Sequence, residues 1–358
     1  MKVGYDVSSL KSTGIFRYNE ELIQTLAALY PQEFTPVFLP QREPANKEYY
    51  KAFKNFVYNR FTLPHEIQAL GVDLFHCTKN FFTPITSEFP TVTTVHDIIP
   101  LVLREQYISN TLEFLYYRYN FGVSINHADA LIVISDFTRG ELIRYYPSCK
   151  NRIHVIHQGC DPHFCAGVDK PAAEKRMRAY GVTRPYMLTM GGAEPRKNVQ
   201  FLVDVFSSGL RDMPHDLVVL GGQWRNLQLS IPREGAGRIH VLADLPREDL
   251  AVAYAAASTF VFPSLYEGFG LPILEAMACG TPVVAHAGSS IPEVAGDAAL
   301  LVAMTDSEAA SCAIKRVLTE PAFAQDLILA GKERVAMLPW EKTARHTVEV
   351  YNLVLRGK

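Results

Sequence analysis

Short apolar runs alternate with segments of helical periodicity along the whole 358-residue chain, and this alternation limits the possible folds more than any other property. It is typical of βαβ units, in which helices cover both faces of a parallel sheet. The strands expected first are Lys2–Val7, Thr35–Leu39, Leu74–Cys77, Val92–Asp97, Ala130–Ser135 and Ile153–His157. Those expected later are Tyr186–Thr189, Leu217–Leu220, Ile239–Leu242, Phe260–Pro263, Val283–Ala285 and Leu300–Val302. The sequence therefore predicts an α/β protein with two doubly wound sheets.

The length of the chain supports a division into two domains, because one hydrophobic core rarely serves more than about 250 to 300 residues. A polar helical stretch, Pro171–Tyr180, separates the two sets of strands. We expect a first Rossmann-like domain over residues 1–165 and a second over 166–338, facing a central cleft. Residues 339–358 are expected to form a terminal helix that can return to the first domain.

Composition and charge exclude several classes of protein. Lys and Arg number 35 against 37 Asp and Glu, a net charge of −2 that is spread over both halves, so nucleic acid is not an expected partner. The sequence contains no run of 18 apolar residues, so a membrane span is not expected. Met1–Lys11 lacks the apolar segment of a signal peptide. The six cysteines form no Cys-x-x-Cys pair, which favours reduced thiols in a cytoplasmic protein over a zinc site or a disulfide framework.

Two glycine-containing loops follow expected strands, where α/β sheets bind their ligands. In the loop Ser8–Ile15, Gly14 lets backbone N–H groups approach an anion, although a glycine at such a place is more often a plain turn residue. In the loop Gly191–Asn198, the adjacent cations Arg196 and Lys197 lie beside a helix N-terminus, which suits a diphosphate. The alternative for these two cations is an ordinary solvated surface position.

A third loop, within Phe262–Pro282, combines a glycine-rich turn with a short helix that ends at Gly280. Glu275 lies about one turn into this helix among apolar residues, where its carboxylate could accept hydrogen bonds from two hydroxyl groups of a ribose or sugar. Glu267 lies in the turn itself. The alternatives are an exposed helix residue for Glu275 and a loop surface charge for Glu267.

Strand ends in the first domain supply weaker candidates. His96 follows a strand and could donate a hydrogen bond to a sugar oxygen, although a structural histidine is the commoner case. Ser135, at the end of the next strand and close to Arg139, is a candidate of the same kind.

Taken together, the Glu-x7-Glu pair of Glu267 and Glu275, the Gly-Gly-x-Glu-Pro-Arg-Lys-Asn loop and the Thr13-Gly14-Ile15 turn resemble the retaining glycosyltransferases of family 4, with the GT-B fold. The resemblance spans nearly the whole chain, and Phe262–Ala295 is its most specific part. It implies a nucleotide-diphosphate sugar, linked to GDP or UDP, as substrate and no separate cofactor.

The resemblance also implies roles for individual residues. Those implied to bind the donor are Gly14, Arg196, Lys197, Glu267, Phe269, Gly270, Leu271 and Glu275. Those implied in catalysis are His96, Arg196, Lys197 and Glu267. By this likeness Glu275 would hold the ribose, Glu267 the sugar hydroxyls, and the chain around Leu242 and Leu245 the base. Ser135 and Arg139 would lie on the acceptor side.

The expected reaction needs positive potential at a departing diphosphate. No Asp-x-Asp pair is present to hold a divalent metal, so we expect Arg196, Lys197 and a helix N-terminus to supply that potential without metal. One departure from the family is visible, since His157-Gln158-Gly159-Cys160-Asp161 replaces a frequent Pro-Asn-Gly-Val-Asp, and contacts assigned to that segment are in doubt.

The acceptor is expected to be a glycan or lipid-linked glycan, and family likeness favours mannose as the sugar and bacterial surface polysaccharide or lipopolysaccharide as the product. The stretch 48–61 interleaves aromatics with cations, which suits peripheral contact with the inner face of the plasma membrane. Its alternative is a helix with aromatics in the core and lysines in water. A sugar-nucleotide epimerase and a catalytically silent binding protein stay open as other functions of the same fold.

Overall fold

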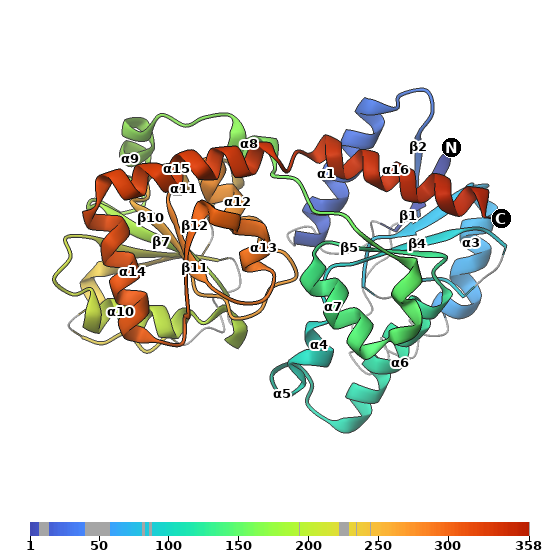
Figure 1. Ribbon diagram of the computed structural model, residues 1–358, viewed down its shortest axis with the longest axis horizontal. Coiled ribbons are helices and arrows are strands. Elements are labelled where there is room, and N and C mark those ends of the chain that lie inside the picture. Colours follow the sequence, from blue (N-terminus) through green and yellow to red (C-terminus); the bar gives the residue numbers. More distant parts are fainter. Residues whose placement is uncertain are drawn as a thin grey trace. The chain divides into compact units, whose positions relative to one another are not determined.

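The computed structural model describes residues 1–6, 14–39, 58–80, 83–85, 88–192, 194–221, 229–233, 235–243 and 245–357. The chain divides into two compact units. Unit one contains Met1–Gly159 and Pro339–Lys358, and unit two contains Cys160–Leu338 (Figure 1). The chain therefore returns to unit one after it has formed unit two, so that its C-terminal segment belongs to the same unit as its N-terminus.

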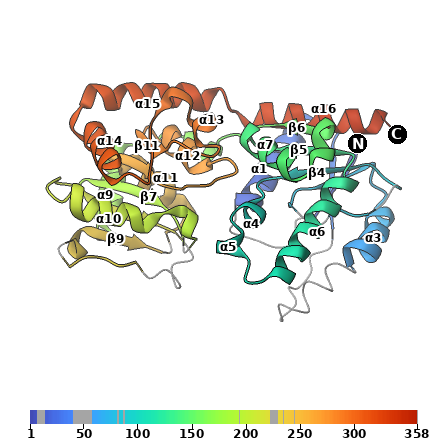
Figure 2. The same cartoon turned by 60° about the horizontal axis from the view of Figure 1, so that its bottom comes forward.

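Unit one is built on a parallel sheet of six strands in the order β2-β1-β3-β4-β5-β6. The strands are β1 (Lys2–Tyr5), β2 (Thr35–Phe38), β3 (Leu74–Cys77), β4 (Thr91–Val95), β5 (Ala130–Val133) and β6 (Ile153–Val155). The α-helices are α1 (Gly14–Leu29), α3 (Leu63–Ala69), α4 (Ile99–Val102), α5 (Arg104–Tyr107), α6 (Thr111–His127), α7 (Asp136–Tyr145) and α16 (Trp340–Arg356). Helices α3 and α6 lie on the opposite side of the sheet from α16 (Figure 2).

Unit two contains a second parallel sheet of six strands, in the order β12-β11-β10-β7-β8-β9. The strands are β7 (Tyr186–Met190), β8 (Asp216–Leu220), β9 (Ile239–Leu242), β10 (Thr259–Phe262), β11 (Val283–His286) and β12 (Ala299–Val302). The α-helices are α8 (Pro162–Cys165), α9 (Lys170–Arg178), α10 (Val199–Gly209), α11 (Arg247–Ala256), α12 (Leu271–Ala278), α13 (Ile291–Ala295), α14 (Ser307–Thr319) and α15 (Pro321–Ala336). Helix α10 packs against α14, and α12 against α15.

The predicted fold class is confirmed, because each of the twelve expected strands is present in one of two parallel sheets. Strands β4, β5, β8 and β10 are buried along their whole length, as expected where helices cover both faces of a parallel sheet. The apolar stripe of α10 packs with α14 on β7, β8 and β10 to form the main core of unit two. Both sheets are thus rigid platforms for the loops at their carboxyl edges.

Helix α16 is joined to the core of unit one by a buried polar network. The Tyr351 hydroxyl lies 2.8 Å from the Tyr5 hydroxyl and 2.6 Å from Nδ1 of His76. Nε2 of His76 in turn lies 2.8 Å from the Thr94 hydroxyl. Burial lowers the pKa of His76 to about 3 and raises that of Tyr351, so this network is neutral at physiological pH.

Gly159 permits the close approach of α16, and its replacement by alanine is expected to destabilise the protein. A Cβ atom there would lie 2.6 Å from the backbone nitrogen of Trp340, and backbone cannot move aside cheaply. We expect a loss of about 1 to 3 kcal/mol in the free energy of unfolding, measured by urea denaturation. Gly140→Ala is the matched control, since Gly140 lies in α7 with no atom within 4 Å of an added Cβ. That variant should be as stable as the parent or more so, and equal losses in both would contradict the steric argument.

Candidate functional site

The strand order of unit two determines where a ligand can bind. If the strands of unit two are numbered along the chain from β7 as the first, their order across the sheet, read from β9 to β12, is third, second, first, fourth, fifth, sixth. The direction of winding therefore reverses between β7 and β10. Open α/β sheets bind ligands outside the carboxyl ends of the strands at such a reversal. The loops that leave β7 and β10 at this point are the two that carry Arg196, Lys197 and Glu267.

Glu267 is the centre of a buried ion cluster at this reversal. Its Oε1 atom accepts from Nζ of Lys197 and from the Ser264 hydroxyl, both at 2.7 Å. Its Oε2 atom lies 2.7 Å from a guanidinium nitrogen of Arg196. Burial alone would raise the pKa of Glu267, but Lys197 and Arg196 outweigh it and hold that pKa below its usual value. The carboxylate is therefore ionised and held in one orientation.

The two cations are themselves positioned by this loop pair. The side chains of Arg196 and Lys197 are only 10% and 20% exposed, so the alternative of solvated surface residues is wrong. The carbonyl of Arg196 accepts from the amide of Leu265 at 2.8 Å, which joins the two loops. A further guanidinium nitrogen of Arg196 lies 2.7 Å from the Glu194 carboxylate. Both cations are thus preorganised rather than free to rotate in water.

The backbone of the first of these loops is shaped by two special residues. Asn198, the N-cap of α10, has φ of 55°, and its side-chain amide donates to the carbonyls of Pro263 and Met304 at 3.3 and 2.7 Å. A Cβ atom at Gly191 would collide with Cγ2 of Val199, so this position favours glycine. These contacts place the cations at the start of α10.

The glycine-rich turn after Glu267 leads directly into α12. Gly270 has φ of 110°, a value that disfavours any residue with a side chain, and α12 begins at Leu271. The Ser290 hydroxyl lies 2.9 Å from the carbonyl of Glu267 and 2.8 Å from that of Phe269, which fixes the turn. The N-terminus of α12, with the positive end of its dipole, follows the ion cluster directly.

Glu275 is buried in α12, with 3% of its surface exposed, so the alternative of an exposed helix residue is wrong. The hydroxyl of Tyr254, from α11, donates to its Oε2 atom at 2.9 Å. This bond orients the carboxylate. Tyr254 is a site residue that sequence reasoning missed, because a tyrosine twenty-one positions earlier gives no signal of a contact. Ser264 and Ser290 were not singled out either, nor was Ser289, whose hydroxyl accepts from the amide of Glu267 at 3.1 Å.

Leu242 and Leu245 lie at and after the end of β9, which is the edge strand of the same sheet. Both are partly buried. The carbonyl of Leu242 accepts from the amide of Gly221 at 3.4 Å. They share the carboxyl edge with the ion cluster, separated from β7 by β8.

His96, in unit one, is buried at the carboxyl end of β4 and has both ring nitrogens near partners. Because a carbonyl only accepts, the 2.9 Å contact with Thr78 shows that Nε2 carries the proton and donates. Nδ1 is then an acceptor, 3.5 Å from the side-chain nitrogen of Gln158. Burial lowers the pKa of His96 to about 4, so the ring is neutral at physiological pH. Gln158 was not singled out from the sequence, although it lies in the segment that departs from the family pattern.

Acid is expected to destabilise the protein through His96. In the unfolded chain this histidine titrates near its ordinary pKa of 6.5, whereas in the folded protein it titrates near 4. The unfolded state therefore binds more protons between these values, and stability falls as pH falls from about 6.5 to 4, by about 3 kcal/mol for this residue. Urea unfolding at pH 7 and pH 5 measures the loss. His96→Gln should lose less over the same range, and an unchanged slope in that variant would contradict the assignment.

The remaining predicted residues of unit one lie as follows. Ser135 is the N-cap of α7, and its hydroxyl accepts from the amide of Thr138 at 3.0 Å, so helix capping accounts for it. Arg139 is exposed and forms an ion pair with Asp136 at 3.1 Å. Gly14 is the first residue of α1, and the preceding residues 7–13 lie outside the described chain. Residues 48–57 of the aromatic and basic stretch also lie outside it.

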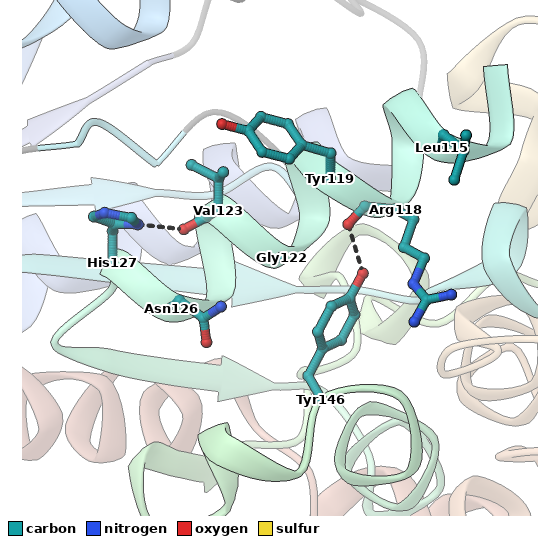
Figure 3. A pocket seen from close by; sticks show the side chains of 8 residues that line it. All are labelled: Leu115, Arg118, Tyr119, Gly122, Val123, Asn126, His127 and Tyr146. Atoms are coloured by element: carbon teal, nitrogen blue, oxygen red, sulfur yellow. Dashed lines mark hydrogen bonds between the residues drawn. The ribbon is translucent and has the colours of Figure 1, made fainter. Parts of the chain in front are cut away.

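A separate pocket of about 400 Å³ lies on unit one (Figure 3). It is lined by Leu115, Arg118, Tyr119, Gly122, Val123, Asn126, His127 and Tyr146. It contains no carboxylate and none of the predicted site residues. Among the described residues, no cluster of three His, Cys, Asp or Glu side chains could hold a metal ion. Within the same ranges, no helix is long and apolar enough to cross a membrane.

Comparison with known proteins agrees with this architecture. Residues 14–164 match the family described as Glycosyltransferase Family 4, and residues 173–334 match Glycosyl transferases group 1. The chain is 31% identical to the O-antigen chain mannosyltransferase B of Escherichia coli, over 99% of this chain and 100% of that protein. The chain therefore belongs to the retaining glycosyltransferases of family 4, with the GT-B fold.

Solved structures share the fold over the full length. Sucrose-phosphate synthase from Thermosynechococcus elongatus superposes with a TM-score of 0.79 at 22% identity, covering 100% of both chains. Anabaena Alr3699/HepE, solved in complex with UDP-glucose, gives 0.73 at 16% identity and covers 98% of this chain and 99% of its own. Membership of the family favours a transferase over the epimerase and over the silent binding protein.

Proposed function

We propose that the protein transfers a sugar, mannose in our assignment, from a nucleotide-diphosphate donor to a glycan or lipid-linked glycan in surface polysaccharide synthesis. The observation that carries the proposed binding of the donor is the position of Glu267. This residue is held ionised between Arg196 and Lys197 at the reversal of winding between β7 and β10 in unit two. The similarity to an O-antigen mannosyltransferase over the full chain supports the sugar and the product class.

In this proposal the two carboxylates bind the two ends of the donor. Glu275 accepts hydrogen bonds from the ribose hydroxyls, with Tyr254 fixing the orientation of its carboxylate. Glu267 accepts hydrogen bonds from hydroxyls of the donor sugar, and the amides of Phe269, Gly270 and Leu271 donate to the same sugar. Leu242 and Leu245 contact the base. A buried, oriented carboxylate pays little reorganisation on binding, so each bond to a sugar hydroxyl is strong.

The cations serve the departing diphosphate. When the bond from the anomeric carbon to the phosphate oxygen breaks, the sugar becomes cationic and the diphosphate gains negative charge. In this proposal Arg196 and Lys197 meet the new charge, and their low exposure and their ion pairs with Glu267 support a role as fixed cations. The N-terminus of α12 adds a dipole of the same sign. Gly14 contributes backbone N–H groups from unit one.

No side chain is assigned as a base for the acceptor. His96 is neutral, and its Nε2–H already donates to Thr78, so its remaining capacity is to accept at Nδ1. We assign it a contact with the donor sugar near the anomeric centre. The acceptor oxygen forms its bond to the anomeric carbon on the same face that the diphosphate leaves, and this retains the anomeric configuration. The acceptor's proton passes to a phosphate oxygen of the donor in this step. Ser135 and Arg139 stay on the acceptor side.

The donor is identified by measuring thermal unfolding with GDP- and UDP-linked sugars, because a bound ligand raises the midpoint. The protein is then mixed with a lipid extract and with the radiolabelled form of the donor that stabilises it. Both transfer of the label and hydrolysis of the donor are followed. We expect stabilisation by GDP-mannose and label in the glycan fraction. Stabilisation without transfer or hydrolysis would favour the silent binding protein. We place the enzyme in the cytoplasm, in peripheral contact with the inner face of the plasma membrane.

Chelation is expected to leave the transferase activity unchanged, since fixed cations rather than a metal neutralise the leaving group. The initial rate is measured before and after dialysis against EDTA, with and without added Mn²⁺. Rates should agree within a factor of about two in the three conditions. A rate that falls on chelation and returns with manganese would refute this part of the mechanism.

A further inference from the structure

Two cysteines flank the start of α8 in unit two. Asp161 is the N-cap of this helix, and its side chain accepts from the amide of His163 at 2.8 Å. Cys160 therefore occupies the position before the cap, and Cys165 the fourth helical position. Side chains at these two positions commonly pack together as a hydrophobic staple. Here the staple consists of two thiols.

The contacts of the two sulfur atoms agree with this placement. Each Sγ atom lies 3.8 Å from the same acceptor, the backbone carbonyl of Asp161. Neither cysteine is in a disulfide in the structure.

The two thiols differ in exposure and acidity. Cys165 is exposed, whereas Cys160 is 6% exposed, with Sγ 3.6 Å from the carbonyl of Leu274 in α12. The neighbouring Cys160 thiol lowers the pKa of Cys165 to about 7, against burial and the nearby Asp161, which raise it. The pKa of Cys160 is raised by the neighbouring Cys165 and by burial, with further increments from Glu275 and Cys279. An exposed, acidic thiol beside a buried partner thiol is the arrangement of oxidation-sensitive cysteines.

We propose that Cys160 and Cys165 form a peroxide-reactive thiol pair, in which Cys165 attacks and Cys160 resolves. The Cys165 thiolate attacks one oxygen of hydrogen peroxide, the O–O bond breaks, and hydroxide leaves with the proton lost by the thiol as water. The sulfenic acid on Cys165 is then attacked by Cys160. The S–S bond forms, the S–O bond breaks, and a second water leaves. Two thiols are oxidised and one peroxide is reduced.

The proposal does not depend on the donor or on transferase activity. Both cysteines lie in one tryptic peptide, which begins after Arg152 and ends at Lys175. The one basic residue of the types that trypsin recognises between these positions is Lys170, which precedes proline and is therefore not cleaved. Reduced protein is treated with equimolar hydrogen peroxide, alkylated with iodoacetamide and digested without reductant. We expect the peptide to be unalkylated and lighter by two hydrogen atoms, and to take up two alkyl groups after dithiothreitol.

Three variants complete the experiment. Cys312→Ser removes another exposed thiol, from α14, and should leave the disulfide unchanged. Cys165→Ser should leave Cys160 reduced and alkylatable after denaturation. Cys160→Ser should stop at a sulfenic acid on Cys165 that dimedone traps. A wild-type peptide that stays reduced, a disulfide to Cys279, or sulfinic acid on Cys165 with Cys160 still reduced would each overturn the proposal.

Discussion

Replacing Arg196 by alanine is expected to slow turnover a few hundred-fold while the donor KM changes little. The arginine is 10% exposed and fixed by Glu267 and Glu194, so its charge is in place before the diphosphate departs. Loss of one such preorganised group costs about 3 to 4 kcal/mol in the barrier. Glu267 keeps Lys197 and Ser264 as partners, so the variant should still fold. Steady-state kinetics with the identified donor separates kcat from KM.

Two further variants test whether charge at this position is responsible. Arg196→Lys keeps a cation but loses the planar fork, and should recover part of the rate. Arg176→Ala is the matched control. It removes an arginine of α9 that lies outside the proposed site and forms an ion pair with Asp249 at 2.7 Å. That variant should turn over like the parent. An Arg196→Ala enzyme with parental kcat would remove the arginine from the mechanism.

Replacing Glu275 by glutamine is expected to weaken nucleotide-diphosphate binding by about 10- to 100-fold. Glutamine has the same size but no charge, and bonds from hydroxyls to a carboxylate are worth about 1.5 to 3 kcal/mol. The substitution also turns the partner of Tyr254 from a carboxylate into an amide. Isothermal titration with GDP and UDP, whichever stabilises the parent, gives the Kd directly.

The control for this loss is Glu248→Gln, which removes an exposed carboxylate from the first turn of α11 in the same unit. Its Kd should equal that of the parent. Tyr254→Phe should weaken binding less than Glu275→Gln, because the carboxylate remains and only its orientation loosens. If Glu275→Gln bound the nucleotide as tightly as Glu248→Gln, Glu275 would not be the ribose ligand.

The strands could be predicted because a buried parallel strand is a local pattern. A run of apolar residues such as Val283–Ala285, bounded by turn residues, has few alternatives at that length. The same holds for the site loops in unit two. A carboxylate such as Glu275, surrounded by apolar residues in a short helix, is visible as an anomaly in the sequence and proved to be buried.

Side-chain partners could not be predicted in the same way. Ser135 stands at a strand end as a binding residue would, and only the position of the Thr138 amide reveals that its hydroxyl also caps α7. The tautomer of His96 depends on the carbonyl of Thr78, eighteen residues away. A local pattern carries no information on such contacts, because they depend on how the loops return over the sheet.

The sequence by itself determined the two doubly wound sheets, the loops that carry Arg196, Lys197 and Glu267, and the family of the protein. Periodicity and turn residues act over a few positions, and a motif needs only its own letters. The tertiary structure decided that Lys197 and Glu267, seventy residues apart, form one ion cluster, and that Tyr351 completes a network with His76 in unit one. Such contacts form only when the strand order brings separate loops together, and burial then decides which groups carry charge.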